Sequence, residues 1–244
     1  MTGRWLEEAV EACGLPPHPA FPRDLAGDVV LTPRLCLAPV PLADLTSDDV
    51  QSWLSQREMP NVVTGPNRPL HGCLVAQAGA GFLLFDSQDD ESEQRFTLAH
   101  EVSHFVLEHL VPRAQALSAF GKAILPVLDG ERPPTKEESL SFVLDRVPLG
   151  TQVRLMDRGP SGCIWRGKVA EVERRADRLA LELLAPATLA LTLLKGVSKD
   201  LAEAQLASRF GLPTDVARMY ARMLLCLEET PRAFIQDLFG KDER

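Results

Sequence analysis

The stretch "RFTLAHEVSHFVLEH", residues 95–109, contains three of the five histidines of the chain. Its apolar residues recur at the spacing of a helix and fill one broad arc of a helical wheel. The remaining sector holds the polar side chains Thr97, His100, Glu101, His104 and Glu108. The stretch therefore predicts a mostly buried helix, over about residues 93–111, with a single polar stripe.

The polar stripe has the His-Glu-x-x-His spacing of a metal-binding helix. His100 and His104 are four residues apart, so their imidazoles lie on adjacent turns and can reach one zinc ion. Glu101 lies beside them, where it can act as a general base towards water at the metal. A solvated stripe on a core-facing helix explains this pattern equally well when it is taken alone. His109 falls inside the apolar arc, which favours a packed core histidine.

A third metal ligand has to come from another segment. Glu108 shares the stripe but lies a turn further along, and ligands on three successive turns of a straight helix cannot converge on one ion. A metzincin would need Gly at position 107 and His at position 110, and both are Leu. The five cysteines are scattered without a C-x-x-C pair, which argues against a thiolate site or a disulfide framework. We therefore expect a carboxylate to complete a His₂Glu site with an open position.

The segment "KVAEVERRADRLALELLAP", residues 168–186, predicts a helix over about 168–185. Glu173 and Asp177 fall within or beside its apolar stripe, and buried carboxylates are costly unless they are paired or bind metal. Glu173 is thus the expected third ligand, and Asp177 the expected acceptor for the N–H of a ligand histidine. Pairing of both acids with arginines, or a rotated helix, would also explain the pattern. Glu171 is the alternative ligand, although it lies on the solvent face of the wheel.

The two segments together resemble motifs of the ImmA/IrrE-type metallopeptidases, which are gluzincin-like enzymes of bacteria and phages. Residues 95–109 are similar to the family's R-F-T-x-A-H-E-x-x-H segment, and residues 173–186 to its E-x-x-A-N-x-F-A-x-x-L-L-M-P helix. The resemblance covers about residues 60–190. The substitutions relative to the family are Ser103 for Gly, Asp177 for Asn, Leu179 for Phe and Ala185 for Met. The stretch between the two motifs is also longer than the family usually shows.

The resemblance implies an α+β fold in which a small antiparallel sheet packs on the H-E-x-x-H helix and a second ligand helix. It implies His100, His104 and Glu173 as metal ligands and Glu101 as the catalytic base. A His₂Glu set favours zinc by ligand type, with manganese as the alternative. The implied activity is cleavage of a helix-turn-helix repressor, a protein substrate whose loss derepresses stress, DNA-damage or mobile-element genes.

The mechanism expected for such a site is hydrolysis of a peptide bond, with Glu101 passing the proton of water to the leaving amine. The segment "FLLFD", residues 82–86, could hold an extended substrate by strand addition at a sheet edge. Tyr220, His71 and several arginines are candidates for stabilising the oxyanion, although ordinary packing or solvation explains each of them.

The chain has 244 residues and a net charge of −8, so general attraction to nucleic acid or anionic lipid is not expected. No apolar run is long enough for a membrane span, and the N-terminus does not resemble a signal peptide, so we expect a cytoplasmic protein without a membrane partner. We predict a metallopeptidase domain over 1–189, with an inserted loop and hairpin at about 112–167. A helical region over 190–244 follows it.

The remaining expected elements are short. We predict helices at 4–13 and 45–59, one or two strands within 28–42, and a hairpin at 73–86. A mobile loop is expected at 130–139, and a second hairpin at 151–168 around "GPSG".

The C-terminal segment "LAEAQLASRFGLPTDVARMYARML", residues 201–224, supports a rival function. Its apolar residues and Gly211 fit a helix-turn-helix pattern. Three arginines could meet phosphates, namely Arg209, Arg218 and Arg222. The alternative is therefore a DNA-binding or repressor-docking regulator that uses about residues 199–225 and has a non-catalytic metal site. A helical hairpin that covers the core is the structural explanation of the same pattern.

Overall fold

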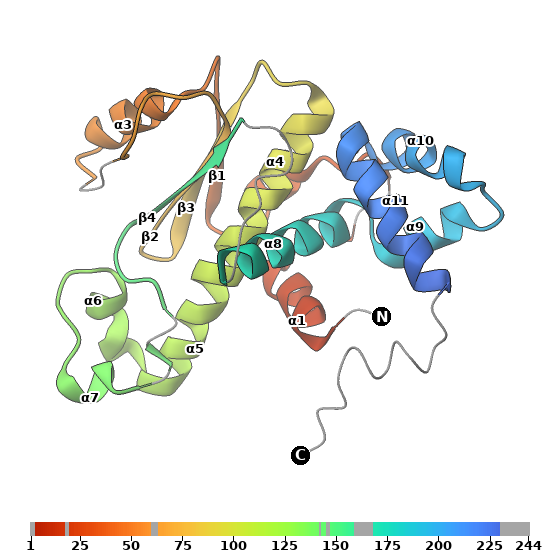
Figure 1. The fold of residues 1–244 in the computed structure, drawn as a ribbon. Coiled ribbons are helices and arrows are strands. Elements are labelled where there is room, and N and C mark those ends of the chain that lie inside the picture. Colours follow the sequence, from red (N-terminus) through yellow and green to blue (C-terminus); the bar gives the residue numbers. More distant parts are fainter. Residues whose placement is uncertain are drawn as a thin grey trace.

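The structure is a computed structural model that describes residues 3–17, 20–59, 63–141, 143–144, 147–158 and 168–229. Its fold is α+β, as expected, with one four-stranded sheet surrounded by helices (Figure 1). The strands are β1 (Leu37–Leu42), β2 (Leu70–Gln77), β3 (Ala80–Asp86) and β4 (Gln152–Asp157), in the order β1-β3-β2-β4.

The hairpin predicted at 73–86 is confirmed as β2 and β3, joined at Ala78 and Gly79, which both have positive φ. The sheet is mixed, however, and the expectation of an antiparallel sheet was wrong. β1 pairs in parallel with β3, and the connection from β1 through α3 (Ser47–Ser55) leads to β2 on the other side of β3. β3 consequently lies between β1 and β2, so "FLLFD" is not the sheet edge that strand addition would need.

The region before β1 contains less strand than expected. Residues Leu25–Val30 form the short helix α2, and only β1 is extended within residues 28–42. The side chain of Asp24 accepts a hydrogen bond from the backbone N–H of Gly27 and so caps the start of α2. This local cap favours a helical turn over the strand that the apolar residues suggested.

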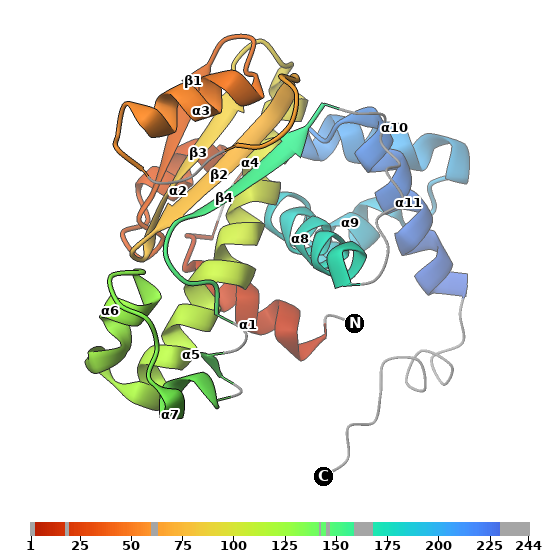
Figure 2. The same cartoon turned by 60° about the vertical axis from the view of Figure 1, so that its left-hand side comes forward.

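Helices cover both faces of the sheet (Figure 2). α3 lies within the helix predicted at 45–59 and begins after the N-cap Thr46, whose side chain forms a capping box with Asp49. Alternate strand residues point to opposite faces: Cys73 and Val75 belong to the cluster under α3, whereas Leu74 belongs to the cluster that contains α4 (Glu91–His104). The H-E-x-x-H helix therefore lies directly on the inner face of the sheet.

The predicted helix at 93–111 is confirmed, with an earlier start and a change of winding. α4 begins after the N-cap Asp90 and continues as a π-helical segment, η1 (Phe105–Leu110). His109 in this segment is only 5% exposed, and its Nε2 accepts the N–H of Gly79 at 3.2 Å. Burial and the nearby Arg113 lower the pKa of His109. His109 is thus a packed histidine that fixes the β2–β3 turn, as the wheel indicated.

The segment 112–167 is more helical than expected. In its described part it contains most of α5 (Val111–Phe120), then η2 (Lys122–Ile124), α6 (Leu125–Leu128) and α7 (Lys136–Ser139), which share a small hydrophobic cluster. A capping box between Thr135 and Glu138 starts α7 inside the stretch predicted as a mobile loop. β4 then forms the sheet edge by pairing with β2, and residues 159–167 of the predicted second hairpin lie outside the described residues.

The helices predicted at 4–13 and 168–185 are confirmed as α1 (Arg4–Cys13) and α8 (Lys168–Leu184). α8 packs across α4 and leads to α9 (Ala187–Leu194), α10 (Lys199–Phe210) and α11 (Thr214–Glu229) (Figure 1). The main hydrophobic cluster includes buried residues of α4, α8, α10 and α11. The domain boundary after residue 189 stays a prediction, although side chains from both sides share this cluster. Among the described residues, no helix combines the length and apolar character that crossing a bilayer requires.

Candidate metal centre

His100, His104 and Glu173 meet where α8 packs across α4. The Nε2 atoms of the two histidines are 3.0 Å apart, and Oε2 of Glu173 is 3.4 Å from each of them. One ligand atom from each residue lies within 4.8 Å of the others, so the group could hold a metal ion. Residues far apart in the sequence are thus brought together as expected from the two motifs.

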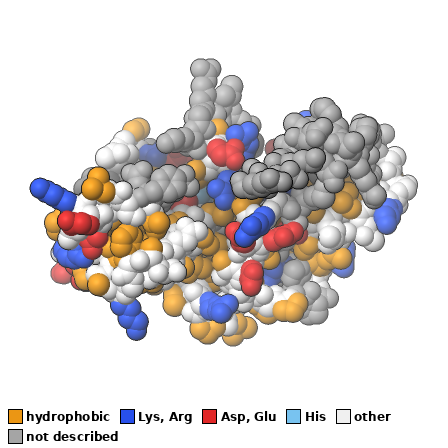
Figure 3. Space-filling model, turned by 90° about the horizontal axis from the view of Figure 1, so that it is seen from below, with side chains coloured by type: hydrophobic (Ala, Val, Ile, Leu, Met, Phe, Trp, Pro, Cys, Tyr) orange, Lys and Arg blue, Asp and Glu red, His pale blue; other side chains and the backbone are white. Residues whose placement is uncertain are grey.

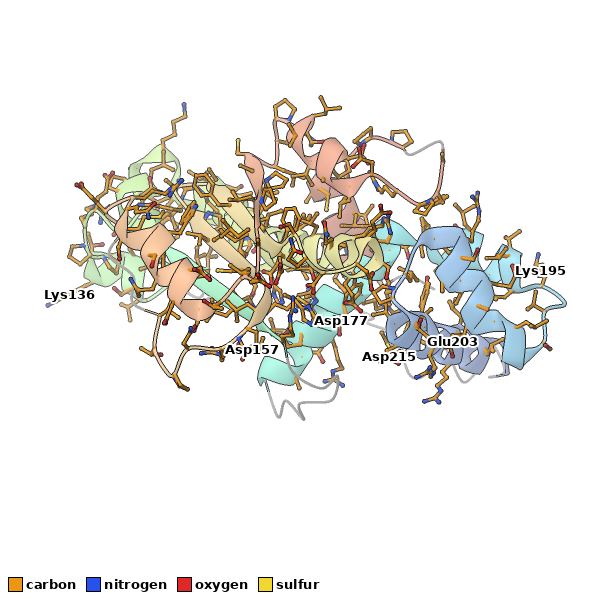
Figure 4. All side chains as sticks on the ribbon, turned by 90° about the horizontal axis from the view of Figure 1, so that it is seen from above. Lys136, Asp157, Asp177, Lys195, Glu203 and Asp215 are labelled. Carbon is orange, nitrogen blue, oxygen red and sulfur yellow. The ribbon has the colours of Figure 1, made fainter. Side chains whose placement is uncertain are left out.

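The other ring nitrogen of each histidine is held by a carboxylate. Nδ1 of His100 lies 2.9 Å from Oδ1 of Asp177, and Nδ1 of His104 lies 2.9 Å from Oε2 of Glu108. A neutral imidazole that donates its Nδ1 proton keeps a lone pair on Nε2, and this arrangement orients metal-ligating histidines. Figure 4 shows Asp177 on α8 close to the middle of the molecule. Asp177 therefore lies where it was predicted to accept a proton.

The role of Glu108 was missed in the sequence. Its exclusion as a ligand is consistent with the structure, in which its carboxylate contacts Nδ1 of His104, not Nε2. The available signal was its position four residues after His104, on the same side of the helix. Glu108 also lies within the π-helical segment η1, a rare winding that often occurs at functional sites.

Arg154 of β4 was missed as well. Its Nη1 donates to Oε2 of Glu108 and its Nη2 donates to Oε1 of Glu173, both at 2.7 Å. Glu173 therefore contacts an arginine and the histidine pair at the same time. The sequence left a place beside the histidines and pairing with an arginine as alternatives, and the structure shows both contacts. The other ligand candidate, Glu171, is exposed and pairs with Arg174.

Glu101 is almost completely buried beside this group, with 1% of its surface exposed. Within the described part of the chain, its Oε2 has no hydrogen-bond partner. A buried carboxylate oxygen without a partner is costly and calls for a ligand or water. This carboxylate lies beside the two Nε2 atoms and the Glu173 oxygen that could hold a metal ion.

A glycine lets α4 approach the sheet at this point. A Cβ atom on Gly72 of β2 would lie 2.5 Å from Cγ2 of Thr97 and 3.7 Å from Cγ of Glu101. Contacts under 3.0 Å are not tolerated without movement, so a larger residue would push the helix away from β2. Gly72 thus permits the close approach of β2 to α4 beside Glu101.

Hydrogen bonds and burial shift the pKa values of these side chains. Burial lowers the pKa of His100, but its hydrogen bonds to Asp177 and Glu173 outweigh burial and raise the pKa to about 10. Burial raises the pKa of Glu101, against the opposing effect of the two histidines. Burial also acts to raise the pKa of Glu173, but hydrogen bonds from His100, His104 and Arg154 hold it well below its ordinary value. A divalent cation held by these residues would have to displace the proton that the raised pKa of His100 favours.

Neither named oxyanion candidate is free in the structure. The buried Tyr220 hydroxyl donates to the carbonyl of Ala185 at 2.8 Å, so it is a packing residue of the C-terminal helices. His71 lies 2.8 Å from Asp89, and Asp89 also contacts Arg158. His71 is therefore held in a hydrogen-bond network with Asp89 before the start of α4.

The C-terminal arginines are mostly held by the protein itself. Arg218 forms hydrogen bonds with Glu203 and Asp215, which Figure 4 shows on the C-terminal helices, and Arg209 lies over the ring of Phe21. Arg222 is exposed. Figure 3 shows positive and negative side chains interspersed on the described part of the face seen from below. The contacts of Arg209 and Arg218 within the protein favour a helical cover over the core more than a phosphate-binding surface.

The site combines two oriented imidazoles, the Glu173 carboxylate and the buried carboxylate of Glu101, whose Oε2 has no hydrogen-bond partner among the described residues. Such a set can bind a divalent cation and move a proton next to it. Comparison of the chain with models of known families gives no match, and comparison with curated proteins gives none either.

Proposed function

We propose that this protein is a zinc-dependent metalloendopeptidase with a gluzincin-like core, similar to the ImmA/IrrE type. The observation that carries the proposal is the convergence of Nε2 of His100, Nε2 of His104 and Oε2 of Glu173. Three protein ligands with an open position are typical of catalytic zinc sites. Two imidazoles and one carboxylate suit zinc, and manganese remains the alternative metal.

The support is stronger than that of an ordinary ion-pair cluster. An ion pair needs one cation and one carboxylate, whereas here both Nδ1 atoms are held by carboxylates of their own, Asp177 and Glu108. That arrangement points both Nε2 atoms towards the same carboxylate oxygen. Carboxylate partners on the outer nitrogen are the usual neighbours of metal-binding histidines.

The chemistry follows from the positions of the chain's own residues. A bound zinc ion would polarise the scissile carbonyl and make water acidic enough to lose a proton near neutral pH. Glu101 accepts that proton and returns it to the leaving amine. Its burial raises its pKa, which suits a group that has to hold a proton between the two transfers. Asp177 and Glu108 keep both imidazoles oriented during the reaction.

The proposed substrate is a protein, and the resemblance of the two motifs favours a helix-turn-helix repressor. We assign the docking of an extended substrate segment to the outer edge of β4, in place of "FLLFD". β4 pairs with β2 on one side, and within the described residues no other strand pairs with it. Strand addition at such an edge uses backbone hydrogen bonds for affinity and side-chain pockets for specificity.

The test is incubation of the protein with a repressor from a neighbouring locus, with and without a chelator, followed by mass mapping of any cut. We expect cleavage by the zinc-loaded chain, loss of cleavage with the chelator, and loss of cleavage with retained zinc in Glu101→Gln. Full cleavage by Glu101→Gln would contradict the assignment of the base. Binding of the repressor without any cut would instead favour a docking regulator.

The second candidate is a regulator that binds DNA through about residues 199–225. Its support is the tight turn at Gly211, which has a φ of 64° and joins α10 to the segment before α11, together with the exposed Arg222. Salt-dependent DNA binding by the full chain would favour this candidate. We expect weak binding, because Arg209 and Arg218 are already engaged within the protein.

A further inference from the structure

We propose that Arg154 is a positioning residue of the metal centre. Its guanidinium holds Glu173 and Glu108 at the same time, so that Glu173 offers a single oxygen to the metal and Glu108 stays on His104. The proposal rests on the proposed metal site and assigns a role to β4, the strand contributed by the segment between the two motifs.

The register of the sheet sets the direction of the Arg154 side chain. Arg154 lies opposite Leu74 in the β2–β4 pairing, and Leu74 packs in the cluster that contains α4. The flanking residues Val153 and Leu155 pack instead with the cluster under α3. Because successive strand residues face opposite sides, Arg154 points to the α4 side. A slip of one residue would move it to the other face and remove both contacts.

The two contacts use the shape of the guanidinium group. Nη1 and Nη2 each donate at 2.7 Å, and they reach carboxylates from two different elements, Glu108 of η1 and Glu173 of α8. The three side chains are 20–31% exposed, so the contacts are partly shielded from water. A planar fork with several fixed donors suits this task, whereas a lysine presents one compact ammonium group.

The first consequence concerns Glu173. Arg154 occupies Oε1, while Oε2 is the atom that lies 3.4 Å from Nε2 of both histidines. A carboxylate held in this way binds a metal through one oxygen, which preserves the open position that catalytic zinc sites need.

The second consequence concerns His104. Oε2 of Glu108 accepts from Arg154 and also contacts Nδ1 of His104. A Glu108 carboxylate held in this place accepts the Nδ1 proton of His104, which leaves Nε2 free for the metal. Arg154 also brings a positive charge to a site that contains the carboxylates of Glu101, Glu108, Glu173 and Asp177. One residue of β4 thus supports two of the three proposed ligands.

The experiment compares zinc binding by Arg154→Gln, Arg154→Lys and a matched control, Arg68→Gln. Arg68 contacts Asp157 of the same strand at 2.6 Å and has nearly the same exposure, but it has no contact with the metal centre among its described interactions. Zinc affinity is measured by competition with a chelator, and folding by circular dichroism. We expect the dissociation constant to rise about 10–100-fold in both Arg154 variants, as for other outer partners of metal ligands. Arg68→Gln should bind zinc as the unchanged chain does.

A second readout separates positioning from general stability. The chain is loaded with cobalt, whose visible absorption reports the geometry of the ligands. We expect the band to change in Arg154→Gln, because Glu173 can then bind through both oxygens, and to stay unchanged in Arg68→Gln. Arg154→Lys keeps the positive charge but lacks the planar guanidinium group with its two donor nitrogens. The same measurements are made on Arg154→Lys if Arg154→Gln does not fold.

The outcomes distinguish this proposal from the proposed function. An unchanged chain that binds no zinc would overturn the proposed function, and this assignment with it. An unchanged chain that binds zinc, with folded Arg154 variants that match it in affinity and in cobalt spectrum, would overturn the role of Arg154 alone.

Discussion

Replacing Gly72 with alanine tests whether the close approach of β2 to α4 positions Glu101. The added Cβ would lie 2.5 Å from Cγ2 of Thr97 and 3.2 Å from the carbonyl oxygen of Leu84. Overpacking of this kind costs about 1–3 kcal/mol, and so short a contact belongs in the upper part of that range. The smaller backbone freedom of alanine in the unfolded chain returns about 0.4–1 kcal/mol. We therefore expect a net destabilisation of about 1–2 kcal/mol.

The assay is thermal unfolding combined with peptidase activity. A change of about 1–2 kcal/mol lowers the melting temperature of a chain of this size by about 2–8 °C. The activity of Gly72→Ala should fall as well, because a displaced α4 moves Glu101 relative to Glu173 on α8. The double variant Gly72→Ala with Thr97→Ser removes the methyl group that the new Cβ meets, so it should recover part of the loss. A melting temperature unchanged in Gly72→Ala, or no recovery in the double variant, would refute the packing argument.

Three further predictions concern the partners of the histidines and their protons. Asp177→Ala should weaken zinc binding by about 10–100-fold, whereas Asp177→Asn should weaken it much less, because asparagine keeps an acceptor oxygen. Equal losses of zinc affinity in both variants, measured by competition with a chelator, would count against Asp177 as the acceptor for His100. Zinc affinity should rise with pH by up to about tenfold per unit between about pH 6.5 and 8.5. The reason is that hydrogen bonds to Asp177 and Glu173 raise the pKa of His100 to about 10, so zinc has to displace a proton from this residue. A zinc affinity that does not change with pH would contradict this expectation. Burial lowers the pKa of His109 below the ordinary histidine value of about 6.5, so the unfolded chain takes up this proton first. The free energy of unfolding should therefore fall as the pH drops below about 6.5, and His109→Gln should show a shallower fall in acid denaturation curves. An unchanged curve would contradict the neutral, hydrogen-bonded histidine.

Much of the candidate site could be predicted because its determinants are local. The helical periodicity of residues 95–109 places His100 and His104 on one side, and the same periodicity places Glu173 and Asp177 on the inner face of the second helix. Acids expected at an inner face are rare without a partner, although the structure leaves Glu173 20% and Asp177 39% exposed, so both are only partly buried. The structure brings these side chains together in the arrangement that the two wheels predicted.

The contacts made by β4 could not be predicted in this way. Whether Arg154 faces α4 or α3 depends on the register of β4 against β2, and that register is set by pairing between segments far apart in the sequence. The parallel pairing of β1 with β3 is non-local for the same reason. α2 could not be predicted for a local reason. The side chain of Asp24 caps a helix in a stretch whose apolar residues suggested a strand. Glu108 had the right spacing, but only its contact with Arg154 shows that it links two elements.

The central claim is that Glu173 is a metal ligand, and zinc content measures it most directly. The amount of zinc per chain is measured after dialysis in the unchanged protein, in Glu173→Gln and in the control Glu171→Gln. Glu171 is a suitable control because it is exposed and, among its described contacts, pairs only with Arg174. We predict about one zinc ion per chain in the unchanged protein and in Glu171→Gln, and a large loss in folded Glu173→Gln. Full zinc retention by Glu173→Gln would contradict the ligand assignment and the account built on it.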